Sequence, residues 1–455
     1  MPEVVRVDGP QGLGPITVAD VAIKDLGHCK FPSPVAAHLG DTAMHYVGEA
    51  DKILVRDSVF HLKQHDTRAS ALPAFELAGP RNRVFFDPAQ LRCGIVTCGG
   101  LCPGMNNVVR GIVLELANGY GVTDVLGFRY GYEGLIPRFG HKPIALTADS
   151  VADIHHDGGT VLGTSRGSQD PVAVVDSLVA LGVQVLFVIG GDGTIRGAMQ
   201  LTAEIARRSL QIGVIGVPKT IDNDIHFIDR SFGFETAFAA AVEVIRTARV
   251  EAIGARNGIG LVKLMGRHSG FVACHAALAS TDVDLVLIPE VAAALAGDRG
   301  VLRCLERVLD RHGHAVVVVA EGAAQELIAD EPRAAPRTDK SGNVRLKDVG
   351  AFLRDEIGAH FSRAGRDVAL KYIDPSYAIR AVPASPSDSV FCWNMARNAV
   401  HAAMAGNTEM LIGRWHARFV HVPMMLATRS RKQVDPADDL WLSVIEATGQ
   451  PKSFV

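Results

Sequence analysis

The sequence predicts an α/β protein with two Rossmann-like domains, each containing a mostly parallel sheet, together with N- and C-terminal extensions. Two observations support this fold class. The chain is 455 residues long, which suits two to three domains. From residue 92 onward, apolar runs alternate with helical patterns, and many of the runs end in glycine or a carboxylate. Strand, loop and helix repeated at this spacing are typical of parallel sheets covered on both faces.

Apolar runs without polar interruption are interpreted as buried strands, and apolar residues at helical spacing as amphipathic helices. The strands expected are Cys93 to Cys98, Val125 to Phe128, Val183 to Ile189, Ile212 to Val217, Gly258 to Lys263, Val283 to Ile288 and His314 to Ala320. The helices expected are Asn106 to Ala117, Thr236 to Arg249 and Val390 to Met404. Residues 326–348 are polar and predict a surface loop or hairpin.

Shifts in composition divide the chain into four segments. Residues 1–91 hold only short apolar runs and are predicted to form an extension that wraps over the main body. Residues 92–230 form the first α/β domain, and residues 231–426 form the second, with interleaved boundaries. Residues 427–455 are a C-terminal appendage with one helix-like stretch, Asp438 to Ala447.

Composition narrows the possible partners and location. A formal net charge of −3 gives no reason to expect nucleic acid or an anionic membrane as a partner. The seven cysteines show no zinc-type or redox spacing, which favours reduced thiols. No apolar signal core or stretch of ~18 apolar residues is present. The sequence therefore predicts a cytoplasmic protein with no nucleic acid and no membrane among its partners.

The motif GGDGT follows the apolar run Leu186 to Ile189. Glycines at the carboxyl end of a parallel strand let backbone amides approach a polyphosphate, and Asp192 can hold the Mg²⁺ that polyphosphates carry. A solvated turn is the alternative, although an unpaired carboxylate there is costly. Lipid kinases and kinases of nicotinamide dinucleotides share these five letters. The motif therefore indicates a phosphoryl donor and leaves the acceptor open.

A second glycine loop, TCGGLCPGMNNVVRG, occupies residues 97–111. An apolar strand runs into Gly99, Gly100 and Gly104, and a helix then begins near Asn106. Exposed amides and the positive end of the helix make an anion site. A tight turn without ligand is the alternative for this loop.

The motif PKTIDND, residues 218–224, discriminates between acceptors. Asp222 and Asp224 are two residues apart, so on an extended segment they face the same way. Two carboxylates this near to each other raise each other's pKa unless a cation, Mg²⁺ or Lys219, lies beside them. One carboxylate can then accept a hydroxyl proton while the other assists metal or arginine placement. A pair of helix-capping aspartates is the alternative.

Four motifs in this order resemble the phosphofructokinase family: GGDGT, PKTIDND, KLMGRHSGF at 263–271 and DPSYAIRA at 374–381. More narrowly, they resemble its long-chain branch, which includes plant and trypanosomatid enzymes. The resemblance spans roughly residues 84–413. It implies an allosteric homo-oligomer, a dimer or tetramer, that uses Mg²⁺ and binds ATP and fructose 6-phosphate in a cleft between two domains. The implied activity is transfer of the ATP γ-phosphoryl to the 1-hydroxyl of fructose 6-phosphate in glycolysis.

The resemblance also implies roles for individual residues on the nucleotide side, the domain at 92–230. Asp192 matches the magnesium ligand, and Tyr132 matches an aromatic ring that packs near the nucleotide. The implied ATP-binding residues are Gly99, Gly100, Tyr132, Arg166, Gly167, Gly191, Asp192, Gly193 and Thr194.

On the sugar side, Asp222 matches the proton acceptor. Asp222 and Arg267 are the implied catalytic residues. Glu321 resembles a carboxylate that holds sugar hydroxyls, which suits a glutamate at a strand end. Tyr377 and Arg380 match a clamp on the 6-phosphate, for which arginine offers a fork of donors. The implied substrate-binding residues are Thr220, Ile221, Asp222, Met265, Gly266, Arg267, Glu321, Tyr377 and Arg380.

Two positions depart from the short bacterial form of the family. Gly258 and Lys371 stand where that form has arginines that cross a subunit interface to the sugar phosphate. Arg256 is a candidate substitute for one of them.

Residues 193 and 219 bear on the choice of donor. An aspartate at residue 193 goes with pyrophosphate in this family, whereas Gly193 leaves room for ATP. Lys219 resembles the lysine of pyrophosphate enzymes, and the combination of glycine and lysine resembles the ATP-using long-chain branch. ATP is therefore the expected donor.

Four other functions remain as alternatives. A pyrophosphate-dependent enzyme would act reversibly on the same acceptor, and a related kinase would act on sedoheptulose 7-phosphate. A non-catalytic partner subunit would have kept the fold for regulation, but it would be expected to lose carboxylates such as Asp192 or Asp222. A lipid or dinucleotide kinase would share GGDGT and lack the other motifs.

Overall fold

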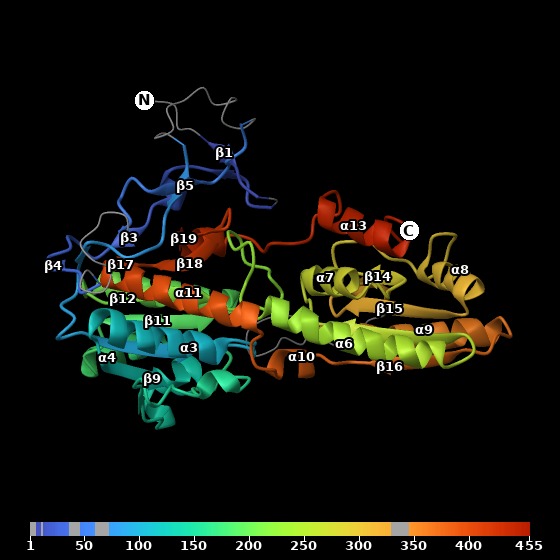
Figure 1. Cartoon of the computed structure of the whole chain (residues 1–455), viewed down its shortest axis with the longest axis horizontal. Helices are drawn as coiled ribbons and strands as arrows, with labels where there is room; N and C mark the ends of the chain where they lie inside the picture. The colour runs from blue at the N-terminus through green and yellow to red at the C-terminus, as the bar shows by residue number, and fades with distance from the viewer. Residues whose placement is uncertain (1–5, 11, 36–45, 60–71, 329–344) are drawn as a thin grey trace. The chain divides into compact units, whose positions relative to one another are not determined.

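The computed structural model describes residues 6–10, 12–35, 46–59, 72–328 and 345–455, and its α/β architecture confirms the predicted fold class (Figure 1). The chain forms two compact units. The first contains Met1–Thr220, Ile225–Gly233 and Val382–Arg431, and the second contains Ile221–Asp224, Phe234–Ala381 and Lys432–Val455.

A seven-stranded sheet organises the first unit. In spatial order its strands are β10 (Ile144–Ala145), β9 (Asp124–Phe128), β8 (Arg92–Thr97), β11 (Val185–Gly190), β12 (Gly213–Pro218), β18 (Met410–Trp415) and β19 (Arg418–Pro423). The strands from β9 to β18 are parallel, and the two edge strands β10 and β19 run antiparallel to their neighbours. The carboxyl ends of β8, β11 and β12 therefore lie at the same edge of the sheet.

Helices cover both faces of this sheet. The side chains of Val96, Leu186 and Val188 share a core cluster with residues of α4 (Pro171–Ala180) and α5 (Asp192–Arg207). Residues between them, such as Phe187, point to the opposite face because side chains alternate along a strand. There α3 (Met105–Leu114), continued by a π-helical turn at Glu115–Gly119, lies beside α11 (Pro386–Met404) (Figure 1). The short α12 (Met424–Ala427) contacts α5.

The N-terminal segment belongs to the first unit. It forms short antiparallel ladders, and one of its strands pairs with residues just before β18. The pairs are β1 (Val7–Asp8) with β2 (Pro15–Ile16), β3 (Lys24–Asp25) with β17 (Asn407–Thr408), β4 (Phe31–Pro32) with β7 (Arg83–Val84) and β5 (Lys52–Leu54) with β6 (Ala74–Glu76). Elsewhere in the first unit, short 3-10 helices lie at Gly131–Leu135, Pro137–Phe139 and Ile154–His156, and one lies in the N-terminal segment at Ala19–Val21.

The second unit contains a four-stranded parallel sheet in the order β14 (Leu285–Leu287), β15 (His314–Ala320), β13 (Gly258–Leu264) and β16 (Ala369–Ile373). Its two faces bury separate clusters. One includes α6 (Phe234–Ile253), α7 (Phe271–Ser280) and α13 (Asp439–Thr448), and the other includes α8 (Val301–His312) and α9 (Val349–Arg363). The 3-10 turn Gln325–Leu327 and the short α10 (Ala378–Ala381) complete the unit.

All seven predicted strands and the predicted helices are present, with ends shifted by a few residues. The observed division of the chain differs from the predicted boundaries. Residues 382–426, placed in the second domain by the sequence, pack in the first unit, because α11 contacts α3 and β18 pairs with β12. The appendage is split at residue 431, and its helix α13 packs in the second unit. Of the predicted loop at 326–348, residues 329–344 lie outside the described residues.

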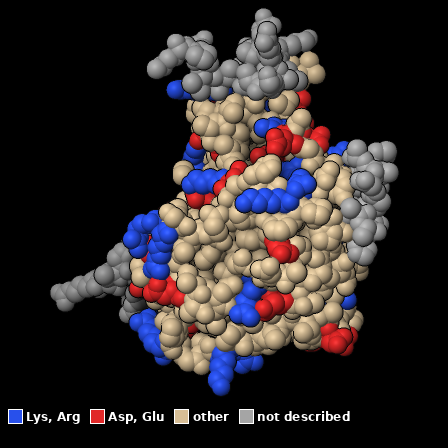
Figure 2. Space-filling view, turned by 90° about the vertical axis from the view of Figure 1, so that its left-hand side faces the viewer, with Lys and Arg blue, Asp and Glu red and all other residues tan. Residues whose placement is uncertain are grey.

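Figure 2 shows one face on which basic and acidic side chains are interspersed with uncharged ones. Among the described residues, no helix is long and apolar enough to span a membrane.

Candidate active site

The predicted nucleotide residues of the first unit meet at the carboxyl ends of β8 and β11. The Cys98 amide donates to the Ile189 carbonyl at 2.9 Å, and the Gly99 amide donates to the Ser165 carbonyl at 3.0 Å. The Thr164 hydroxyl also donates to the Gly99 carbonyl. These bonds bring the glycine loop at 97–111 beside the loop that carries Arg166 and Gly167. Arg166 is exposed there.

Lys219 ties the two glycine loops together. This residue follows β12, and its backbone amide donates to the Gly190 carbonyl at 3.0 Å. Its side chain is almost buried, with 7% of the residue exposed, and Nζ donates to the Gly100 carbonyl at 2.8 Å. Gly99 has φ of +84°, and a Cβ there would lie 3.3 Å from Nζ, so glycine suits both the turn and the close approach.

Asp192 opens α5, directly after Gly191. Its Oδ1 lies 3.2 Å from Nε of Arg196, and its Oδ2 lies 3.6 Å from Nη2 of Arg431. Sequence reasoning missed both arginines, although Arg196 stands just two residues after the GGDGT motif. Among the described residues, and apart from its chain neighbours and its own helix backbone, a Cβ at Gly193 would meet no atom within 4 Å, so the space beside this residue is open.

Tyr132 packs against the first turns of α5. Its hydroxyl donates to the Thr194 carbonyl at 2.9 Å, and a Cβ at Gly197 would lie 3.0 Å from its ring. Burial raises the pKa of Tyr132 well above its usual value, so the phenol stays protonated. The structure thus places Tyr132 beside GGDGT.

The PKTIDND motif passes from the first unit, which holds Thr220, to the second, which holds Ile221–Asp224. The Ser231 hydroxyl donates to the Thr220 carbonyl at 2.6 Å, and the Ser269 hydroxyl donates to the Asp222 carbonyl at 2.9 Å. Ile221 is buried.

The conformation of this motif corrects one expectation. Asn223 has φ of +54°, in the left-handed region that asparagine tolerates better than most residues. The segment is therefore bent between Asp222 and Asp224, and the argument that an extended chain turns both carboxylates the same way does not hold. Asn223, which lies between the two aspartates, is the sequence signal that could have indicated this turn.

The predicted sugar residues of the second unit meet where β13 and β15 end. The Glu321 amide donates to the Leu264 carbonyl at 2.9 Å, and the Gly322 amide donates to the Gly266 carbonyl at 3.1 Å. A Cβ at Gly322 would lie 2.0 Å from the Arg267 carbonyl oxygen, so the two loops can approach this closely because residue 322 is glycine. Met265, Gly266, Arg267 and Glu321 are thereby brought together.

Charged groups surround Glu321. Burial raises the pKa of its carboxyl, and Arg267, Lys263 and Arg380 partly oppose the shift while Asp374 adds to it. Lys263 Nζ lies 2.8 Å from Asp374 Oδ2 and 3.1 Å from Asp348 Oδ1. Burial alone would lower the pKa of Lys263, but these carboxylates raise it, so the ammonium stays charged.

Tyr377 and Arg380 lie together at α10. The guanidinium carbon of Arg380 is 4.7 Å from the Tyr377 ring centroid. Tyr377 is 76% exposed, and Arg380 is half-buried. Lys263 and Asp374 had not been singled out, although they stand at the first positions of KLMGRHSGF and DPSYAIRA.

The sequence profile described as Phosphofructokinase matches residues 92–403. The chain belongs to the phosphofructokinase family. It is 52% identical over 440 residues, 96% of each chain, to a protein of Amycolatopsis methanolica named ATP-dependent 6-phosphofructokinase. It is 47% identical over 377 residues to ATP-dependent 6-phosphofructokinase 7 of Arabidopsis thaliana, covering 83% of this chain and 77% of that one.

Less similar relatives are also named phosphofructokinases. An ATP-dependent 6-phosphofructokinase of Trypanosoma brucei brucei is 42% identical over 441 residues, covering 96% of this chain and 88% of that one. The resemblance to plant and trypanosomatid members is confirmed. A solved pyrophosphate-dependent phosphofructokinase from Marinobacter aquaeolei superimposes with a TM-score of 0.61 at 19% identity, covering 80% of this chain and 93% of that one. This likeness shows the shared phosphofructokinase fold.

The structure explains one of the two departures from the short bacterial phosphofructokinases and shows where the other one lies. Gly258 begins β13, and a Cβ there would lie 2.0 Å from the Ala252 carbonyl oxygen, which excludes arginine. Lys371 is exposed on β16, an edge strand, and Arg256 is exposed before β13. The substitution of Arg256 for one of the interface arginines stays a prediction.

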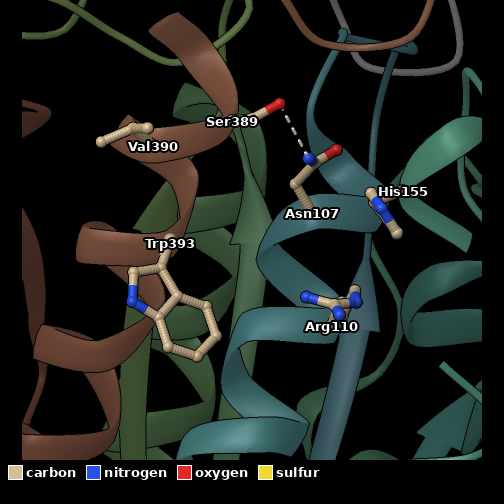
Figure 3. A pocket seen from close by; sticks show the side chains of 6 residues that line it. All are labelled: Asn107, Arg110, His155, Ser389, Val390 and Trp393. Atoms are coloured by element: carbon tan, nitrogen blue, oxygen red, sulfur yellow. Dashed lines mark hydrogen bonds between the residues drawn. The ribbon is translucent and has the colours of Figure 1, made fainter. Parts of the chain in front are cut away.

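A pocket of about 270 Å³ lies elsewhere on the first unit of this phosphofructokinase (Figure 3). It is lined from α3, α11 and the turn at 154–156, and the Asn107 amide donates to the Ser389 hydroxyl at 3.2 Å. The lining residues are Asn107, Arg110, His155, Ser389, Val390 and Trp393. This set contains none of the predicted ATP or sugar residues.

Proposed function

We propose that this protein is an ATP-dependent 6-phosphofructokinase, a phosphotransferase that moves the γ-phosphoryl of ATP to the 1-hydroxyl of fructose 6-phosphate. The observation that carries the proposal is the cluster of Glu321, Arg267 and Arg380 in the second unit. A kinase that shared GGDGT alone would have no need for it. The cluster combines a carboxylate for sugar hydroxyls with guanidinium groups for a phosphate.

On the ATP side, the proposed contacts are backbone amides of Gly99, Gly100 and Gly191 to Thr194, with Arg166, Gly167 and Tyr132 beside them. The finer proposal for the metal is Mg²⁺ on Asp192. A single carboxylate suits Mg²⁺, which completes its shell with substrate phosphates and waters. Within the described ranges, no group of three His, Cys, Asp or Glu residues could hold a metal without substrate. Bound Mg²⁺ would offset phosphate charge, and Asp192 would exchange arginine contacts for it.

On the sugar side, we assign the general base to Asp222. Thr220 and Ile221 contact the acceptor beside it, as do Met265, Gly266 and Arg267, and Arg267 also faces the charge that develops during transfer. Glu321 accepts hydrogen bonds from sugar hydroxyls. Tyr377 and Arg380 clamp the 6-phosphate, which does not react.

Gly193 supports ATP as donor, because the space beside it is open. A reversible pyrophosphate-dependent enzyme is the second candidate, and it is favoured by Lys219, which stands where pyrophosphate enzymes have a lysine. In this structure Nζ of Lys219 is bonded to the Gly100 carbonyl. A sedoheptulose 7-phosphate kinase is the third candidate.

Initial rates separate these candidates. Purified protein with Mg²⁺ is given ATP or pyrophosphate, each with fructose 6-phosphate or sedoheptulose 7-phosphate. We expect the highest kcat/KM for ATP with fructose 6-phosphate. A preference for pyrophosphate or for the seven-carbon sugar would select the corresponding alternative, and no turnover with any pair would overturn the kinase assignment.

We further propose that the enzyme works in the cytoplasm, where its glycolytic substrates are, as a homodimer or homotetramer. The family resemblance supports this assembly, and sedimentation of the purified protein tests it.

A further inference from the structure

The chain passes from the first unit to the second between residues 431 and 432. The three residues that follow this point contact the two loops that carry Asp222 and Arg267 on the proposed sugar side. We call Lys432, Gln433 and Val434 the strap. The Lys432 amide donates to the Asp224 carbonyl at 2.9 Å, and Nε2 of Gln433 donates to the His268 carbonyl at 2.9 Å. One bond therefore reaches the loop that carries Asp222, and the other reaches the loop that carries Arg267.

Glu290 connects the strap to the second of these loops. Its Oε1 accepts from the Val434 amide at 2.8 Å and from the Gly270 amide at 2.9 Å. Gly270 is the residue before α7, three positions after Arg267. A Cβ at Gly270 would lie 2.4 Å from Ile288, so the loop packs tightly against this part of the unit.

The two loops are also bonded directly to each other. Ser269, which is fully buried, donates its hydroxyl to the Asp222 carbonyl at 2.9 Å. The backbone on either side of Asn223 is therefore held, at Asp222 by Ser269 and at Asp224 by the strap. Because Asn223 adopts a left-handed conformation, this turn depends on its surroundings more than an extended segment would.

We propose that the strap, with Glu290, positions Asp222 and Arg267 for phosphoryl transfer. This inference rests on the proposed function. A general base must lie within hydrogen-bond reach of the hydroxyl that it deprotonates, and a misplacement of about 1 Å can cost about a hundredfold in rate. Lys432, Gln433, Val434 and Glu290 are thus positioning residues that act through the two loops, while Asp222 and Arg267 are the groups that contact the substrate.

A purely structural anchor offers a matched control in the same C-terminal segment. Gln450 is buried, its Oε1 accepts from the Val286 amide at 2.6 Å, and its Nε2 donates to the Val286 carbonyl at 3.2 Å. These bonds attach the end of the chain to β14 and do not involve either loop. Loss of Gln450 should therefore lower stability without disturbing the site.

The test compares Glu290→Ala, Glu290→Gln, Gln433→Ala and Gln450→Ala with wild type, by thermal unfolding and by steady-state kinetics with both substrates. For Glu290→Ala we expect kcat to fall about tenfold to a hundredfold and KM for fructose 6-phosphate to rise. KM for ATP should stay unchanged, because the ATP residues belong to the first unit. Glu290→Gln keeps a carbonyl oxygen at Oε1 and should restore most of kcat. Gln433→Ala, at an exposed residue, should fold and lower kcat less.

The outcomes separate a positioning role from simple anchoring. Gln450→Ala should lower Tm and leave kcat and both KM values as in wild type. If Glu290→Ala and Gln433→Ala do the same, the strap is an anchor and the inference is wrong. If wild type itself does not phosphorylate fructose 6-phosphate, the proposed function fails first, which distinguishes the two failures.

Discussion

The two units hold their proposed site residues by different means. In the first unit, glycine loops at the ends of β8 and β11 are joined through the backbone and through Lys219, which binds a carbonyl oxygen. In the second unit, charged side chains gather around Glu321, and Lys263 is paired with Asp374 and Asp348. Backbone amides suit a polyphosphate, whereas side chains can distinguish a sugar hydroxyl from a phosphate. We therefore expect the donor to be bound largely by backbone amides of the glycine loops, and the acceptor largely by side chains.

The largest effect is expected in the second unit, at the proposed base. Asp222→Ser should lower kcat by about 10²–10⁴ with a modest change in KM, because a general base acts in the transition state. Steady-state kinetics with ATP and fructose 6-phosphate measure it. Asp224→Ser, on the same loop, should cost less. Near wild-type turnover in Asp222→Ser would show that another group takes the proton.

In the first unit, Gly193→Asp should abolish the use of ATP. A carboxylate about 4 Å from a nucleotide phosphate costs roughly 4 kcal/mol at an effective dielectric of about 20, which is near a thousandfold in affinity. Gly193→Ala is the matched control, because in the part of the chain that the structure describes a Cβ there meets no side chain within 4 Å, and ATP use should persist. Rates with ATP and pyrophosphate check both variants. Full ATP activity in Gly193→Asp would remove Gly193 from donor choice.

A smaller effect is expected at the phosphate clamp. Arg380→Ala should raise KM for fructose 6-phosphate about tenfold to a hundredfold, the size of a lost charged hydrogen bond, and change kcat little. KM for ATP should not change. A rise in KM for ATP instead would contradict the division of roles between the two units. The same assay measures both constants.

The smallest effect concerns acid stability of the first unit. His401 is 2% exposed, and Nδ1 lies 2.8 Å from the Tyr120 hydroxyl. Burial, with Arg397 and His421 nearby, lowers the pKa of His401 to about 3. Between this value and the unfolded pKa of about 6.5, the unfolded state binds more protons than the folded state. The free energy of unfolding of the protein therefore falls by up to about 1.4 kcal/mol per pH unit as pH falls.

Urea unfolding at pH 7 and pH 5.5 tests this linkage. His401→Asn should lose less stability than wild type over that interval. Equal losses in the two proteins would mean that His401 is not the group responsible. Glu321 of the second unit has a raised pKa, so its own contribution has the opposite sign and weakens as pH rises.

Many elements could be predicted from the sequence because their signals are local. Buried parallel strands such as β11 and β15 are continuous apolar runs, and the glycine turns after β8 and β11 follow directly from such runs. The α/β class, the seven strands and the family therefore followed from the sequence. The hairpin of β18 and β19 did not, because its strands close a sheet whose other members lie far away in the chain.

By itself, the sequence predicted, through its motifs and their resemblance to a family, which residues carry chemistry: Asp192 after a glycine turn, Asp222 in PKTIDND, and Arg267, Glu321 and Arg380 in later motifs. The tertiary structure decided how these residues are supported. It bent the chain at Asn223, paired Asp192 with Arg196 and Arg431, and brought the strap to two loops. Local patterns record which residues a strand or turn requires. Contacts such as that between Gln433 and His268 join residues 165 positions apart, and they exist once packing has brought the two segments together.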